Sequence, residues 1–175
     1  VTTMRLVYGT ESHEFGQGTA PELVAAQLRL ALPGRDIKTV RHGLFDIDGV
    51  VFDCAHHGSG PGSRAWLRGN IARYYTRSLM MDDLLAEKKP PRVVLRAHYH
   101  THLRETVRIR PNGHEYVTDF VLTPSYCGMT HYALKVTRSS YMLGCGLVAF
   151  EIVDGALEGV HPFVRTVDLR TEEAL

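Results

Sequence analysis

Five histidines lie in two short stretches of the sequence, and each stretch follows an apolar run. They are His56, His57, His98, His100 and His102. The last three alternate along RAHYHTH (96–102), and in a regular strand such alternate residues would share one face. Imidazole is a common ligand for Zn, Mn, Fe and related ions. Since ligand sites in open α/β sheets gather at the carboxyl ends of strands, we expect the two stretches to converge on one metal site.

The apolar periodicity predicts the elements that would position these histidines. We expect strands over 4–8, 37–41, 44–47, 50–55, 92–97, 103–109, 115–123, 147–153 and 157–167. Asp48-Gly49, Asn112-Gly113 and Asp154-Gly155 predict tight turns between neighbouring strands. The pattern indicates an α/β fold with two or more sheets, outer helices and antiparallel strands toward the C-terminus. Residues 1–175 are expected to form a single domain.

Two helices are predicted, each with its own start signal. Thr19 and Glu22 form a capping box for a helix that ends near Ala31. Ser63 is the expected N-cap of a long helix over 64–87. Its predicted apolar face consists of Trp66, Leu67, Ile71, Tyr74, Tyr75, Leu79, Leu84 and Leu85. The arginines of this helix, Arg64, Arg68, Arg73 and Arg77, are interpreted mainly as a solvated face.

Composition narrows the class of protein. The net charge is +1, from 20 basic and 19 acidic residues, which argues against a large nonspecific nucleic-acid footprint. No apolar run approaches the ~20 residues of a membrane span, and VTTMRLVYGT lacks the features of a signal peptide. Three widely spaced cysteines, Cys54, Cys127 and Cys145, favour buried thiols in a reducing compartment. A cytoplasmic protein without a membrane partner is therefore expected.

Known metal motifs were compared with the second stretch. A metallo-β-lactamase motif fails because Leu103 follows His102, and HExxH is absent. A cupin fits better, since Glu105 and Gly113 follow the HxH at nearly the expected spacing. However, the glycine expected upstream is missing, and the long helix does not suit an all-β barrel. A cupin-like protein with one metal ion is kept as a third alternative.

Three motifs in order resemble a known family. They are GTESHE (9–14), VVFDCAHHG (50–58) and VVLRAHYH (93–100). Their order is similar to the second half of the calcineurin-like metallophosphoesterases, with phage-type and prokaryotic members nearest. Ala97 stands where the GHxH motif of that family has glycine. The resemblance implies a four-layer βαβα sandwich, of which this chain would form the C-terminal half.

The resemblance also implies roles for individual residues. His56 and His98 would bind one metal ion, with His57 as a substitute ligand, and His100 would bind a second. His13 would stabilise or protonate the leaving oxygen. Arg64 and His131 are the candidate substrate contacts. The implied activity is hydrolysis of phosphomonoesters or phosphodiesters with divalent ions (Mn, Fe, Zn or Ni), acting on a phosphorylated small molecule or a nucleic acid.

The chain also departs from that family. Ser12 stands where the family has a metal-binding asparagine, and neither DxH nor GDxxD occurs in the sequence. Two explanations follow: the chain is the C-terminal portion of a longer enzyme or is completed by a partner, or it is a non-catalytic remnant or interaction module. Either would expose a sheet edge, so self-association is expected.

Asp46, Asp48 and Asp53 are interpreted as turn and strand residues. Arg96 is expected to point to the opposite face from Ala97 and at best to support the ligands from behind, and Tyr99 is expected to face the side opposite to the histidines.

Overall fold

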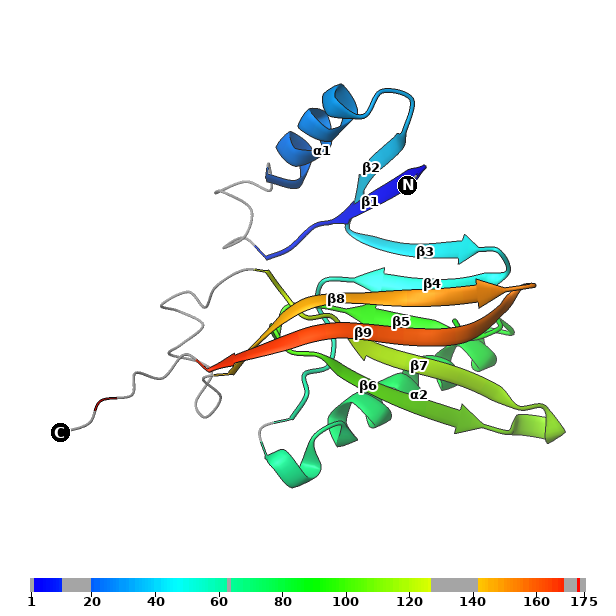
Figure 1. Ribbon diagram of the computed structural model, residues 1–175. Helices are drawn as coiled ribbons and strands as arrows, with labels where there is room; N and C mark the ends of the chain where they lie inside the picture. The colour runs from blue at the N-terminus through cyan, green and yellow to red at the C-terminus, as the bar shows by residue number, and fades with distance from the viewer. Residues whose placement is uncertain (1, 11–19, 63, 127–141, 169–172, 174–175) are drawn as a thin grey trace.

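The computed structural model describes residues 2–10, 20–62, 64–126, 142–168 and 173, which form a mixed α/β fold (Figure 1). The strands are β1 (Thr3–Val7), β2 (Asp36–Val40), β3 (His42–Ile47), β4 (Val50–Ala55), β5 (Val93–Arg96), β6 (Leu103–Ile109), β7 (Tyr116–Leu122), β8 (Met142–Val153) and β9 (Ala156–Asp168). The α-helices are α1 (Ala20–Ala31) and α2 (Asn70–Leu85), and two 3-10 turns are η2 (Ala65–Leu67) and η3 (Pro111–Gly113). The α/β fold class predicted from the sequence is therefore confirmed at this level.

A five-stranded mixed sheet forms the centre, in the order β3-β4-β5-β7-β6. β4, β5 and β7 run parallel, and β3 and β6 are antiparallel edge strands. β5 is short and almost wholly buried, as its apolar sequence predicts for a central strand. Because β4 and β5 are parallel neighbours, their carboxyl ends lie at the same edge of the sheet.

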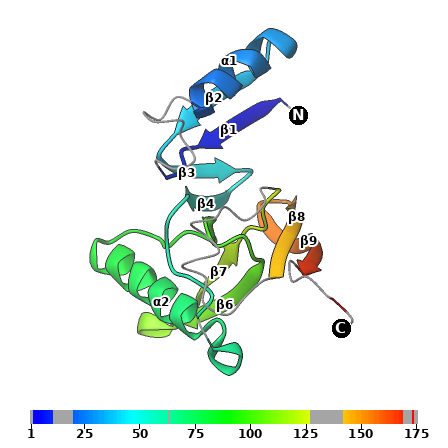
Figure 2. The same ribbon diagram turned by 90° about the vertical axis from the view of Figure 1, so that its left-hand side faces the viewer.

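The central sheet is covered on both faces (Figures 1 and 2). On one face, Val50, Phe52 and Val93 pack against side chains of the β8–β9 hairpin, including Phe150 and Leu157. On the other face, Val94, Phe120 and Leu122 pack against α2. The alternation of neighbouring residues between the two cores follows from the two-residue period of a strand.

A second, two-stranded sheet stands beyond β3 in both views (Figures 1 and 2). β1 and β2 pair in parallel, and α1 packs beside them. Glu22 of α1 accepts hydrogen bonds from Thr39 and Tyr8, and these bonds lower the pKa of its carboxyl. Its predicted capping partner, Thr19, lies outside the described residues.

The predicted hairpin turns are confirmed by the backbone. Asp48-Gly49 and Asp154-Gly155 each place two residues in succession at positive φ, between 49° and 86°. Such paired positive φ angles are those of the two-residue turns that match the twist of antiparallel strands. Asn112 and Gly113, in the β6–β7 connection, also both have positive φ.

The long helix expected over 64–87 is wrong at its N-terminal end. η2 precedes it, and α2 begins at Asn70 because Gly69 has φ 88° and interrupts the helix. The positive φ of Gly69 favours glycine, and a Cβ atom there would also require the Glu105 side chain to move. The predicted apolar face is only half correct. Five of the residues predicted for it are exposed: Trp66, Leu67, Ile71, Tyr74 and Leu85. The buried stripe of α2 is formed by Ala72, Thr76 and Met80.

In the described part of the chain, neither helix is long and apolar enough to cross a membrane.

The strand does not continue through the histidines of RAHYHTH, in agreement with the predicted strand bounds of 92–97 and 103–109. β5 ends at Arg96 and β6 begins at Leu103, so 97–102 form the loop between them. The three histidines therefore do not share a strand face.

Candidate metal centre

The ends of β4 and β5 bring two histidines together. Cys54 pairs with Leu95 in the sheet, and the Ala97 N–H then donates to the His56 carbonyl at 3.1 Å. This bond extends the parallel pairing just past the last residue of each strand. His56 and His98 thus lie side by side at the carboxyl edge of the central sheet.

A cluster of three imidazoles results, formed by His56, His57 and His98. One ring nitrogen from each lies within 4.8 Å of the others. His56 Nε2 and His98 Nδ1 are 3.2 Å apart. The centroid of the His57 ring is 4.6 Å from that of His98. We call these residues the histidine cluster.

The histidine cluster fits a divalent metal ion. Two imidazole nitrogens on a tetrahedral ion, each about 2.0–2.1 Å from it, are separated by about 3.4 Å. The 3.2 Å between His56 Nε2 and His98 Nδ1 is close to that value, and a ring nitrogen of His57 lies within 4.8 Å of both. His57 is exposed and the other two are half-buried, so solvent or a ligand can approach the cluster. Three histidines with an open position form the ligand set of some catalytic zinc sites.

The backbone at His98 is strained. Its φ is 75°, and the N–H of Tyr99 donates to the carbonyl of Ala97 at 3.0 Å across it. This two-residue hydrogen bond with positive φ defines the rarer and more strained form of γ-turn. His100 follows with φ 49°. Strained residues persist where surrounding structure holds them, and they cluster at functional sites.

The other two histidines of the loop have different surroundings. His102 Nδ1 lies 3.0 Å from the Leu122 carbonyl, which requires Nδ1 to carry the proton because a carbonyl only accepts. This bond ties the end of the loop to β7. The carbonyl of His100 accepts from Gly144 N–H at 2.8 Å, which ties the middle of the loop to β8. Within the described residues, the His100 ring is not part of the group of three.

A buried arginine lies directly below the histidine cluster. The Arg96 side chain is 1% exposed and donates to Asp53 Oδ1 at 2.8 Å. Asp53 is also 2.6 Å from His42 on β3. The sequence marks Arg96 only as a charge inside an apolar strand. Its partners could not be read from the sequence, because they come from two other elements.

Arg68 was expected from the sequence to lie on a solvated helix face, but its side chain bonds to the histidine loop. It precedes α2, and its Nη2 donates to Thr101 Oγ1 and to the His102 carbonyl, both at 2.8 Å. Arg68 therefore holds the far side of the histidine loop. Arg64, the predicted substrate contact, lies with its guanidinium carbon 5.8 Å from the centre of the Trp66 ring. His13 and His131 lie outside the described residues, so their predicted roles stay predictions.

The acidic and thiol groups near the cluster have structural surroundings. Asp46 accepts the Gly49 N–H at 2.8 Å, a turn bond that agrees with its expected role. Burial, followed by the charge of Asp53, raises the pKa of the Cys54 thiol to about 11. A thiol this weakly acidic is a poor thiolate ligand at neutral pH, so the donors at this edge are imidazoles.

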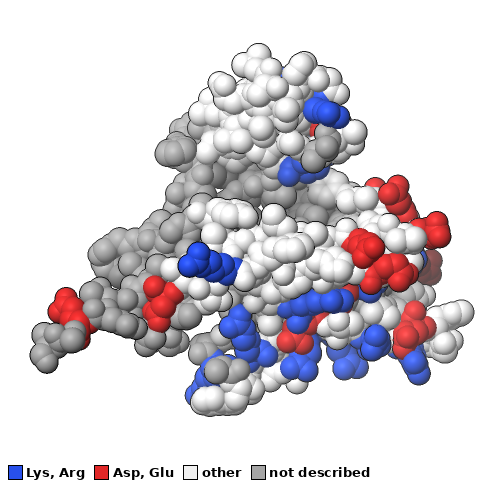
Figure 3. Space-filling model, viewed as in Figure 1, with Lys and Arg blue, Asp and Glu red and all other residues white. Residues whose placement is uncertain are grey.

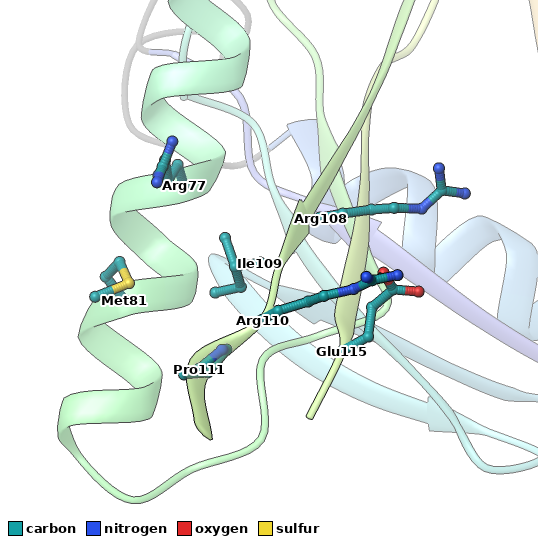
Figure 4. Close-up of a pocket in the computed structure, with 7 residues that line it drawn as sticks. All are labelled: Arg77, Met81, Arg108, Ile109, Arg110, Pro111 and Glu115. Carbon is teal, nitrogen blue, oxygen red and sulfur yellow. The ribbon is translucent and has the colours of Figure 1, made fainter. Parts of the chain in front are cut away.

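Basic side chains gather at the opposite end of the central sheet. Figure 3 shows arginine and lysine side chains on the lower part of the molecule, over the region of β6 and β7. A surface hollow of about 660 Å³ at this end is lined by Arg77, Met81, Arg108, Ile109, Arg110, Pro111 and Glu115. In Figure 4, Arg77 projects from α2, whereas Arg108 and Arg110 extend to the other side of β6. Arg110 is neutralised by Glu115 at 2.7 Å. The guanidinium groups therefore do not converge on one anion.

Comparisons with known proteins found two weak structural likenesses. The Thermotoga maritima protein TM1076 is 15% identical with a TM-score of 0.31, over 80% of this chain and 58% of its own. A single mutant of Vps29 from Entamoeba histolytica is 13% identical with a TM-score of 0.34, over 78% of this chain and 63% of its own. The chain thus spans about three fifths of each. No protein-family model and no curated protein matches it.

Proposed function

We propose that the chain is a metallophosphoesterase-like domain whose histidine cluster binds a divalent metal ion for phosphoester hydrolysis. The observation that carries the proposal is the 4.8 Å grouping of three ring nitrogens at the carboxyl edge of parallel strands. The order of the GTESHE, VVFDCAHHG and VVLRAHYH motifs supports the phosphoesterase class. The mixed sheet with outer helices is compatible with half of a βαβα sandwich.

The residues of the chain have distinct tasks in this proposal. A bound divalent ion supplies an activated water and polarises the phosphate oxygens. His56 and His98 hold the ion from the two strand ends, and His57 completes the set from the exposed side. His13 assists the leaving oxygen, and His100 is available to a second ion, as the family resemblance implies.

In the family that the motifs resemble, the two-metal site takes ligands from two further motifs. The DxH and GDxxD motifs that supply them in the family do not occur among residues 1–175. We propose that these ligands come from a preceding segment or a partner chain. The alternative function is a metal-binding interaction module of the same fold that does not hydrolyse phosphoesters.

Metal binding is the first test. The wild-type chain should bind about one Zn²⁺ or Mn²⁺ per molecule with micromolar or better affinity in calorimetry. His56→Ala and His98→Ala should each weaken binding at least tenfold, because each removes one of three ligands. The matched control is His114→Ala, an exposed histidine in the β6–β7 connection, which should bind like wild type. Equal binding by all four proteins would place the metal elsewhere.

Hydrolysis is the second test and separates the two functions. The metal-loaded chain is assayed with bis(p-nitrophenyl) phosphate and with p-nitrophenyl phosphate. Activity that falls at least a hundredfold in His98→Ala, but not in His114→Ala, would support the enzyme. A metal-loaded chain without activity, alone and with any preceding segment restored, would favour the interaction module.

A further inference from the structure

We propose that Arg96 is a positioning residue that sets the separation of His56 and His98. The role of this separation in metal binding rests on the proposed function. The contacts of Arg96 with the ends of β4 and β5 do not depend on it. The position of Arg96 is informative: it is the last residue of β5, two residues before His98. Its charge is buried in the central sheet, where an arginine needs a full set of partners.

The guanidinium group bonds to both strands that carry the cluster. Nη1 donates to the carbonyl and the carboxylate of Asp53 on β4 at 2.9 and 2.8 Å. Nη1 also lies 2.9 Å from the Leu95 carbonyl on β5. Asp53 is three residues before His56. The side chain thus acts as a crosslink between β4 and β5 just before each strand reaches its histidine.

The remaining contacts fix Arg96 from the other sides. Its Nε and Nη2 lie 3.3 Å from the Tyr75 hydroxyl on α2. Its carbonyl accepts from the Thr123 N–H at 2.8 Å. These bonds join β5 to the helix on one face and to the residue that follows β7. Arg96 therefore has little freedom to move independently of its neighbours.

The loop that follows His57 is shaped around this arginine. A Cβ atom at Gly58 would lie 2.7 Å from Cγ and Cδ of Arg96, closer than atoms in contact can approach. The glycine allows the loop to pass directly over the guanidinium stem. The residue after His57 therefore lies directly against the same side chain that ties the strands carrying His56 and His98.

A second ion pair, just before the start of the same strand, provides the matched control. Arg92, four residues earlier, donates to the buried carboxylate of Asp119 at 2.8 Å. Arg92 immediately precedes β5 and Arg96 ends it, so their backbones are about 13 Å apart for four extended residues. Loss of either pair should lower stability, but only loss of the Arg96–Asp53 pair should disturb the histidine cluster.

The experiment compares Arg96→Met and Asp53→Asn with Arg92→Met and Asp119→Asn in the full chain. Co²⁺ is the probe, because its visible absorption reports the geometry of its ligands. We expect the first two variants to bind Co²⁺ about 10–100-fold more weakly, with shifted absorption bands. The control pair should keep the wild-type spectrum and an affinity within about threefold. Equal effects on the spectrum from both pairs would overturn the proposal.

Two further measurements keep the proposal testable if a variant does not fold or wild type binds no Co²⁺. Tyr75→Phe is a milder change, and it should shift the Co²⁺ bands in the same direction. In the metal-free protein, NMR contacts between the His56 and His98 ring protons should weaken in Arg96→Met and persist in Arg92→Met. Persistence of these contacts in Arg96→Met would reject the positioning role. Absence of Co²⁺ binding with loss of the contacts would reject only the metal function.

Discussion

His98 combines an imidazole beside His56 with a backbone conformation that L-residues rarely adopt. The φ of 75° is imposed by the γ-turn that reverses the chain directly after β5. In a regular strand, the parallel register of β4 and β5 would place His98 beside His57. The strained turn instead keeps its ring 3.2 Å from His56, so strain and ligand position have the same structural origin.

A glycine comparison tests this strain. The metal-free His98→Gly variant should be more stable than His98→Ala by about 1 kcal/mol, because glycine accepts positive φ without a steric penalty. Urea denaturation in the presence of a chelator measures the difference. At His42, in extended strand β3, the order should reverse, with alanine more stable than glycine. The same order at both positions would mean that His98 is not strained.

The sequence could predict part of the site at this scale. His56 and His98 were recognisable because each follows an apolar strand, and parallel strand ends meet at one edge. The γ-turn was not predictable, since alternating histidines fit a strand equally well. The Asp53 partner of Arg96 was interpreted as a strand residue, because no local pattern shows which buried charges face each other across neighbouring strands.

At the scale of elements, a buried carboxylate joins the two strands β6 and β7 to the start of β5. Asp119 is fully buried and accepts hydrogen bonds from Arg92, Arg104 and Thr106. Burial by itself would raise the pKa of this carboxyl. The bonds from Thr106 and Arg104 and the charge of Arg92 outweigh burial and hold the pKa below its ordinary value.

This depressed pKa predicts a specific acid sensitivity. The stabilisation from the Asp119 carboxylate should be complete above about pH 4, where the unfolded side chain is also ionised. It should be lost as the pH falls through the lower pKa of the folded state. Asp119→Asn should lower stability by about 3 kcal/mol at pH 7 and flatten the decline of stability below pH 4. Urea denaturation from pH 7 to pH 3 measures both, and parallel curves for the two proteins would contradict this account.

Most elements were predictable from the sequence, and the exceptions have physical reasons. The hairpin turns follow from Asp-Gly and Asn-Gly pairs, which need no tertiary information. The start of α2 was misplaced because helical periodicity continues through Trp66 and Leu67. The helix begins only after Gly69, whose φ of 88° is left-handed, and no local pattern shows that the chain adopts this conformation there.

At the scale of the whole molecule, apolar side chains remain on the surface. Leu30 of α1 and Leu44 of the edge strand β3 are 77% and 70% exposed. Phe163 of β9 is 63% exposed. Exposed apolar groups on an edge strand favour pairing with another chain.

We therefore predict that the chain self-associates through the side of β3. Sedimentation equilibrium should show an average mass that rises with concentration in the range of about 10–300 µM. Leu44→Lys should shift this rise to at least tenfold higher concentration, because a charge opposes edge pairing. Asn112→Lys, in the exposed β6–β7 connection, should leave it unchanged. A monomer mass at every concentration would refute the prediction.

The central claim is that His56, His57 and His98 share one metal ion. X-ray absorption spectroscopy of the Zn²⁺-loaded chain tests it most directly, since imidazole rings give a characteristic multiple-scattering pattern. Three imidazole nitrogens at about 2.0–2.1 Å are expected in the wild type, and two in His98→Ala. A wild-type shell of oxygen atoms with one imidazole or none would contradict the account.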